Sequence, residues 1–296
     1  MINAIVLSKD KACQLDLLIE SISKNCKNIF NIKVIYESSN SSFELGYNKL
    51  KEKLYYKNRF GLDFPIRWYE RRNKNLSQDI LNTLDDSVDL TCLLNDENIF
   101  FSNFGSYKSI LNLFRKEPLA SLSLRLGDNT VIQNPYSIGR YFIDKPEKFS
   151  LIDNKFIGWD ASLIKPFTNF GMPFSHNGHV YTTKLLKHVL SVTEIDEIDS
   201  LEKLIQQNLY SGVFASSVSP FMACLKNSVV VTNTATALSD PEDFEQIFDT
   251  SLFSVNERYL HGYKIDYDFF NFSNISKPFQ QHVTRFRREN NMQYGL

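Results

Sequence analysis

The segment with the clearest chemical potential is a cluster of acids and amides that follows an apolar run. The run at 90–94 predicts a buried strand, and it leads directly into Asn95, Asp96 and Glu97. Two adjacent acids at a strand end repel each other unless a cation or solvent relieves the repulsion. A divalent ion bound there can bridge to a diphosphate and neutralise a leaving group. A polar turn that simply ends the strand is the alternative, because Asn and Asp are common turn residues.

Three basic residues lie beside apolar runs in a similar way. Lys9 and Lys11 come after the first apolar run of the chain, and Arg125 closes the run at 120–126. A cation at a strand end can face a diphosphate. For Arg125, an ion pair with Asp128 or another acid is an alternative that stays open.

The elements that must position these groups alternate between strand and helix. In the first half, the predicted strands are 2–7, 32–36, 66–69 and 90–94, and the predicted helices are 13–23, 43–55 and 76–84. This alternation predicts an α/β fold with a mainly parallel sheet and helices on both faces. Ligands of such sheets bind beyond the carboxyl ends of the strands, which is where the acids and lysines lie.

The second half is less regular. Its predicted helices are 107–115, 180–190 and 201–209, and its predicted strands are 120–126 and 228–231. The basic stretch at 285–288 is interpreted as a solvated face. We find no internal repeat and no clear linker, so a single domain over 1–296 is expected.

The composition and the missing motifs exclude several classes of protein. Of 296 residues, 43% are apolar, enough for a sizeable core, and the net charge of −1 provides no global field for nucleic acid. The sequence lacks GxGxxG and GxxxxGK[ST] loops, which argues against a Rossmann dehydrogenase and a P-loop NTPase. Four cysteines without a CxxC pair predict a reducing compartment, and the N-terminus lacks the basic region of a signal peptide. A cytoplasmic location is therefore expected.

Two segments resemble the GT-A-fold, family-2-like glycosyltransferases. The sequence IVLSKDKACQL at 5–15 resembles their opening strand and the polar loop that reaches the nucleotide base. The segment at 95–97 resembles the Asp-X-Asp motif that ends their fourth strand. Shorter similarities lie at 123–127 and 177–179. The resemblance implies a GT-A-like fold of the nucleotide-diphospho-sugar transferase type.

The resemblance also implies roles for individual residues. A divalent ion, Mn²⁺ or Mg²⁺, would be held by acids of the motif and by a histidine from the C-terminal region, with His282 the best match and His261 second. The expected metal ligands are Asp96, Glu97 and His282. The residues expected at the donor are Ser8, Lys9, Asp10, Glu37, Asn95 and Asp96. Arg125 is added to them because of its place near the end of a predicted strand.

Two asparagines depart from the family pattern. Asn95 stands where the first Asp of the motif is expected; it can bond a ribose hydroxyl but supplies no charge. An inverting enzyme needs a base that takes the proton of the acceptor hydroxyl. Asn177 stands where related sequences have an acid, and an amide cannot act as a base. Asp160 and His179 are therefore the catalytic candidates, with His176 as a further substitute.

Together these features lead to the hypothesis of a metal-assisted glycosyltransferase. It would move a sugar from a nucleotide-sugar donor to a hydroxyl of a glycan or lipid-linked acceptor, with a nucleotide-binding half at 1–100 and an acceptor-side half at 101–296. Because such acceptors are often lipid-linked, peripheral membrane contact is left open, whereas no nucleic-acid partner is expected. Two alternatives stay open. One is a sugar nucleotidyltransferase, although its usual Gly-rich loop is missing, and the other is a non-catalytic nucleotide- or sugar-binding homologue that scaffolds glycan assembly.

Overall fold

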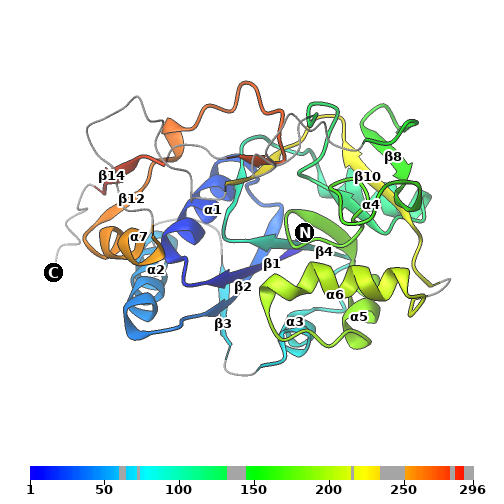
Figure 1. The fold of residues 1–296 in the computed structure, drawn as a ribbon. Coiled ribbons are helices and arrows are strands. Elements are labelled where there is room, and N and C mark those ends of the chain that lie inside the picture. Colours follow the sequence, from blue (N-terminus) through cyan, green and yellow to red (C-terminus); the bar gives the residue numbers. More distant parts are fainter. Residues whose placement is uncertain are drawn as a thin grey trace.

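The chain folds around one nine-stranded sheet with the strand order β3-β2-β1-β4-β9-β6-β10-β8-β7 (Figure 1). The computed structural model describes residues 1–59, 65–71, 74–131, 145–214, 217–233, 251–280 and 284–289. The strands of this sheet are β1 Ile2–Lys9, β2 Phe30–Glu37, β3 Ile66–Glu70, β4 Leu90–Asn95, β6 Ser121–Ser123, β7 Ser150–Ile152, β8 Phe156–Asp160, β9 His179–Thr182 and β10 Phe221–Leu225. The helices are α1 Ala12–Asn25, α2 Ser41–Arg59, α3 Leu76–Thr83, α4 Tyr107–Lys116, α5 Thr183–Ser191, α6 Ile198–Tyr210 and α7 Leu252–Leu260.

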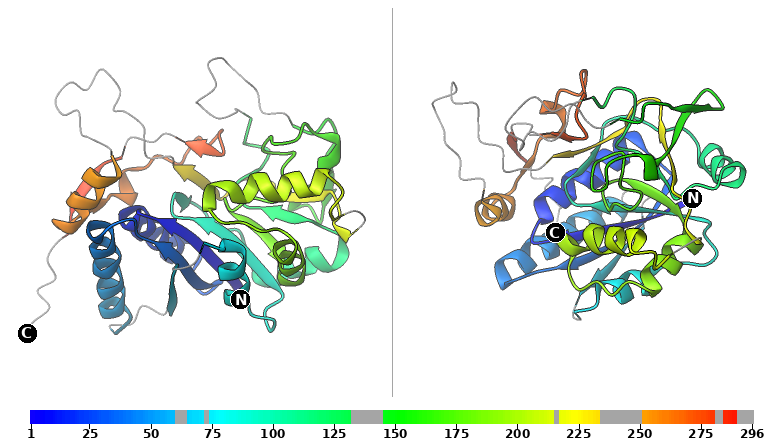
Figure 2. Two further views of the ribbon diagram at one scale, coloured as in Figure 1. Left: turned by 60° about the horizontal axis from the view of Figure 1, so that its bottom comes forward. Right: turned by 45° about the vertical axis from the view of Figure 1, so that its right-hand side comes forward.

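The first four strands form the parallel part of the sheet, with helices on both faces. Strand β1 pairs in parallel with β2 and β4, and β2 pairs in parallel with β3. Every residue of β1 except Lys9 is buried. Helices α1 and α2 lie on one face of these strands, and α3, α5 and α6 on the other (Figure 1 and Figure 2). Alternate residues of β1 face opposite ways: Val6 belongs to a core cluster with α1 and α2, and Leu7 to one with α3, α5 and α6. The predicted α/β class with helices on both faces is confirmed.

Beyond β4 the sheet becomes mixed. Strand β9 lies between β4 and β6 and is antiparallel to both, and β8 is antiparallel to β10 and β7. The predicted helix at 180–190 therefore begins later than expected. Val180 and Tyr181 belong to β9 and are fully buried, because branched and aromatic side chains fit an interior strand. The helix follows at Thr183, and the Thr182 side chain accepts the Leu185 amide as its cap.

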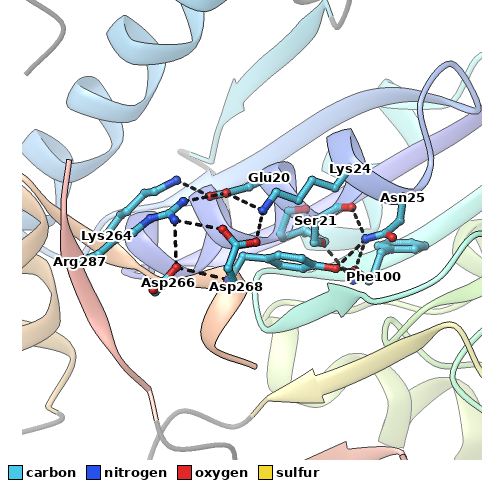
Figure 3. A network of polar contacts seen from close by, with 11 residues as sticks. Glu20, Ser21, Lys24, Asn25, Phe100, Lys264, Asp266, Asp268 and Arg287 are labelled. Atoms are coloured by element: carbon cyan, nitrogen blue, oxygen red, sulfur yellow. Dashed lines mark hydrogen bonds and ion pairs between the residues drawn. The ribbon is translucent and has the colours of Figure 1, made fainter. Parts of the chain in front are cut away.

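Two smaller sheets complete the fold. One has the order β13-β11-β5 and consists of Phe279–Gln280, Val230–Asn233 and Asn98–Phe100; the other pairs β12 Tyr263–Ile265 with β14 Phe286–Arg288. Ion pairs attach the second of these sheets to α1 (Figure 3). Glu20 of α1 pairs with Lys264 and Arg287, and Arg287 also reaches Asp268. The basic stretch of β14 thus lies on a half-exposed, ion-paired face.

Two observations describe the chemistry of the chain outside its candidate site. Within the described residues, no helix has the length and apolar character needed to cross a membrane.

All four cysteines are buried free thiols. Burial raises the pKa of the Cys13 thiol to about 12 and of the Cys26 thiol to about 12. Buried thiols of this kind are weak nucleophiles, so we treat the cysteines as core residues.

Candidate active site

A cleft of about 230 Å³ opens beyond the carboxyl ends of β1 and β4. From β1 the chain crosses to β2 on one side, whereas β4 pairs with the other side of β1. This is the point at which the strand order reverses, and open α/β sheets bind ligands in the crevice that such a reversal creates. The titratable side chains that line the cleft are those of Lys9, Lys11, Arg71 and His176 and of four acids, Asp96, Glu97, Glu197 and Asp199.

Lys11 joins the two strand ends across the cleft. Its Nζ atom lies 2.6 Å from Glu97 Oε1 and 3.9 Å from Asp96 Oδ1. Burial would lower the pKa of Lys11, but Asp96 and Glu97 outweigh this and raise it above its usual value. The residue is the N-cap of α1, where the helix dipole disfavours a cation, so the two carboxylates are what favour the charged form of Lys11.

Asp96 is the buried acid of the ion-paired group around Lys11. Its Oδ2 atom accepts the Lys9 backbone N–H at 3.2 Å, and the residue is 5% exposed. Burial raises the pKa of Asp96 to about 7, since the opposing effect of Lys11 is smaller, and Glu97 raises it further. The Ser8 side chain lies beneath it and bonds the Tyr47 hydroxyl at 2.7 Å. Asp96 is thus poised to change charge near neutral pH.

Glu37 and Arg71 form a second ion-paired group, at the ends of β2 and β3. Arg71 Nη1 lies 2.6 Å from Glu37 Oε2, and Lys9 Nζ lies 3.3 Å from Glu37 Oε1. Arg71 also donates to the carbonyl of Asp196 at 2.6 Å, just before α6. This arginine joins the parallel strands to the loop that leads into α6. Sequence reasoning missed Arg71, which has no local motif around it.

A network of amides lies between the strand ends and α6. Asn95 Nδ2 donates to Asn177 Oδ1 at 2.7 Å, and Asn177 Nδ2 donates to Glu202 Oε1 at 3.0 Å. The same carboxylate oxygen accepts the His176 amide at 3.1 Å and the Ser175 hydroxyl. Burial would raise the pKa of Glu202, but His176 and Ser175 outweigh it and hold the pKa well below its usual range. The network therefore contains an ionised carboxylate, one oxygen of which accepts three hydrogen bonds.

The wall opposite the lysines is the N-terminus of α6. Glu197 is its N-cap residue and Asp199 lies in its first turn. Both are exposed, and both line the cleft. Asp199 is close enough to Lys11 to contribute to its raised pKa. Sequence reasoning missed these two acids, although acids in the first turn of a predicted helix are a recognisable pattern.

The predicted residues divide into two groups in the structure. Lys9, Asn95, Asp96 and Glu97 line the cleft, and Ser8 and Glu37 contact residues that line it. Asp10 does not line it: the residue has φ of 59°, and its side chain accepts the Ser39 amide at 2.7 Å, which fastens the turn after β1.

The two catalytic candidates lie apart from the cleft lining. Asp160 is the N-cap of the 3₁₀ turn Ala161–Leu163, where its Oδ1 accepts the Ser162 amide at 2.9 Å. His179 has no exposed surface, and its Nδ1 lies 3.5 Å from the Pro173 carbonyl. Burial, assisted by Arg125, lowers the pKa of His179 to about 3. The buried, neutral imidazole of His179 cannot exchange protons with a substrate in the cleft, and Asp160 does not line the cleft, so neither is our candidate base.

Arg125 is buried behind the cleft. It is 0% exposed, and its guanidinium carbon lies 4.2 Å from the centroid of the Phe279 ring, which lines the cleft. Its three guanidinium nitrogens have no hydrogen-bond partner among the described residues. The alternative of an ion pair with Asp128 is not found there. Phe279 separates the cation from the cleft in this structure.

The described part of the predicted metal site does not fit a divalent ion. Asp96 and Glu97 are the only predicted ligands in the described residues, and Lys11 lies against both. Within the part of the chain that the structure describes, no group of three or more His, Cys, Asp or Glu side chains is arranged to hold a metal. His282 lies outside the described residues, so its role stays a prediction.

The chain is thus an α/β protein with a cleft at the strand-order reversal, and the fold agrees with the GT-A resemblance. Neither a scan of protein-family models nor a search of curated proteins finds a match. Among solved structures, the chain is similar to S. aureus TarS 1-349 in complex with UDP: identity is 11% and the TM-score 0.48, over 86% of this chain and 65% of that one. For TarS 1-349 with UDP-GlcNAc, identity is 11% and the TM-score 0.48, over 82% and 63%. The chain is also similar to 4-diphosphocytidyl-2C-methyl-D-erythritol synthase from Anaerococcus prevotii, with 13% identity and a TM-score of 0.41 over 88% and 96%.

Proposed function

We propose that the chain is a glycosyltransferase that binds a nucleotide-sugar donor in the cleft between β1 and β4. The observation that carries the proposal is the position of Lys9, Lys11 and Arg71 at the strand-order reversal, where they line one cavity. Lys9 and Lys11 have side chains 47% and 26% exposed, so both can contact a diphosphate, whereas Arg71 is 5% exposed and holds Glu37 in place. The N-terminus of α1 favours an anion at the same place. An acceptor that supplies a hydroxyl, from a glycan or a lipid-linked glycan, would approach from the α6 side.

The acids of α6 supply a base for the transfer. The acceptor oxygen forms a bond to the anomeric carbon of the sugar, and the bond from that carbon to the diphosphate oxygen breaks. The departing diphosphate keeps the electron pair, and the hydroxyl proton passes to a carboxylate. Asp199 is our candidate for that carboxylate, because it is solvent-accessible, lines the cleft and faces Lys11.

The proposal is tested first by ligand binding. Thermal unfolding is followed with UDP, GDP, CDP and CMP, each with Mn²⁺ and with EDTA. A single nucleoside diphosphate is expected to raise the melting temperature, since a ligand at 100 times its Kd adds about 2.7 kcal/mol of stability. Loss of that rise in Lys9→Met, with normal melting of the free variant, would locate the ligand in the cleft. Absence of any rise in well-folded protein would overturn the proposal.

A non-catalytic sugar- or nucleotide-binding scaffold is a second candidate, and one observation favours it. The two asparagines that replace expected acids, Asn95 and Asn177, are hydrogen-bonded to each other at 2.7 Å. Neither is therefore available as a base or an anionic ligand. The two functions differ in donor hydrolysis: a transferase releases nucleoside diphosphate slowly to water, whereas a scaffold binds the donor and leaves it intact.

A further inference from the structure

Lys11 occupies the position that a divalent ion would take between the two acids of the strand end. Its ammonium lies 2.6 Å from Glu97 Oε1 and 3.9 Å from Asp96 Oδ1. A metal bound by these carboxylates would have to displace the ammonium and take up the same contacts. The side chain is 26% exposed, so one side of the ammonium remains open to the cleft. The acids thus hold a cation with an accessible face.

The backbone of Lys11 is fixed on both sides of the residue. Its amide donates to the Tyr47 hydroxyl at 3.2 Å, and its carbonyl accepts the Leu15 amide at 2.9 Å, which begins α1. Tyr47 is 0% exposed and is held in turn by Ser8 at 2.7 Å. Buried residues therefore fix the backbone that carries the ammonium, so the ammonium needs little reorganisation when a charge develops beside it.

We propose that Lys11 is the cation that neutralises the departing diphosphate, in place of a divalent ion, and that Glu97 positions it. This inference rests on the proposed function and deepens it. The bond between the anomeric carbon and the diphosphate oxygen breaks with its electron pair on that oxygen, and the Lys11 ammonium meets the new charge. Donor binding and turnover then need no divalent metal.

The first test measures metal binding and does not depend on activity. Mn²⁺ alone is titrated into the whole chain by calorimetry, for wild type, Lys11→Met and the control Lys184→Met, which removes an exposed lysine on α5. Wild type and the control are expected to show no binding below millimolar concentration. Lys11→Met is expected to bind Mn²⁺ at least 10-fold more tightly, because Asp96 and Glu97 lose their ammonium. Micromolar binding by wild type at these acids, abolished in Glu97→Gln, would overturn the proposal.

The second test measures release of nucleoside diphosphate from the donor that the thermal-shift panel identifies. EDTA is expected to change the wild-type rate less than 2-fold. Lys11→Met is expected to lower the rate about 100-fold, as for loss of one preorganised donor at a developing charge, and Lys11→Arg to recover part of it. Complete loss with EDTA and recovery with Mn²⁺ would contradict the inference while supporting the transferase. Absence of nucleotide binding altogether would remove the proposed function itself, and the inference with it.

The variants also need a check on folding. Lys11→Met is followed by thermal unfolding beside wild type, and a melting temperature within a few degrees shows that the cleft is intact. If Lys11→Met fails to fold, Glu97→Gln supplies the test, because it leaves the ammonium in place but removes the charge that holds it. A rate that falls several-fold in Glu97→Gln and does not change with EDTA supports the assignment, whereas a wild-type rate in this variant or an EDTA-sensitive rate refutes it.

Discussion

Asn95 and Asn177 are hydrogen-bonded to each other, with 2.7 Å between the donor Nδ2 and the acceptor Oδ1, and they join the end of β4 to the loop before β9. Two carboxylates at this separation would repel each other unless they shared a proton. The two asparagines that depart from the family pattern are therefore hydrogen-bond partners, and each satisfies a polar group of the other in a part-buried position. Asn177 continues the unit to Glu202 of α6.

Asn95→Asp is predicted to destabilise the fold, because a carboxylate oxygen replaces the amide donor and faces Asn177 Oδ1, which keeps only the Thr232 hydroxyl at 3.3 Å. The expected loss is about 1–3 kcal/mol, the cost of an unsatisfied buried polar group. Urea unfolding measures it. Asn103→Asp is a matched control, since Asn103 is exposed and its side chain accepts the Gly105 amide at 2.7 Å, which a carboxylate also does. Equal stability of the two variants would contradict the prediction.

Asp96→Asn is predicted to stabilise the protein increasingly as the pH rises. The pKa of Asp96 is about 7 in the folded chain, whereas an unfolded Asp has a pKa of ~3.9. Between these values the folded state holds a proton that the unfolded state releases, so the stability of wild type falls as the pH rises through this window. Asn keeps an acceptor for the Lys9 amide and cannot ionise. Its advantage in melting temperature should grow from pH 5 to pH 8, and a constant difference over that range would disprove the shift.

Asp199→Asn is predicted to lower donor turnover about 100-fold or more, as expected for loss of a general base. The affinity for the nucleoside diphosphate should stay within a few-fold, because the base acts on the hydroxyl and not on the diphosphate. Asp196→Asn is the control, since Asp196 is an exposed neighbour that contributes its carbonyl to Arg71. An Asp199→Asn variant with full turnover would move the assignment to Glu197, which lines the same wall.

Arg125→Met is predicted to cost less than about 1 kcal/mol, or to stabilise the fold, because a buried charge with no hydrogen bond to any described residue is replaced by an apolar chain of similar volume. Burial lowers the pKa of Arg125 to about 10, which reflects the same desolvation. Arg125→Ala should cost about 2–4 kcal/mol more, since it leaves a cavity beside Phe279. Both are measured by urea unfolding. Equal losses in the two variants would show that the charge has a partner that stabilises it.

The sequence was sufficient for features that depend on short stretches of chain. Short apolar runs located β1, β2, β3 and β4, because strands of a parallel sheet are buried on both faces, and the helical period located the helices between them. The acidic strand end at Asp96 and Glu97, and the lysines after β1, were also visible. Parallel strands bring their carboxyl ends to one edge of the sheet, so local patterns alone predicted that these groups meet.

Only the tertiary structure decided which distant residues complete the cleft. Asn177 reaches Asn95 across 82 positions because β9 pairs with β4, and Lys11 reaches Glu97 across 86 because β4 pairs with β1. Conversely, Arg125, Asp160 and His179 carry reactive groups, yet the strand order places them behind or beside the cleft lining. The sequence specifies the chemical type of each side chain. The exposure and the partners of that side chain depend on which strands pair, and strand pairing is determined by burial over the whole sheet.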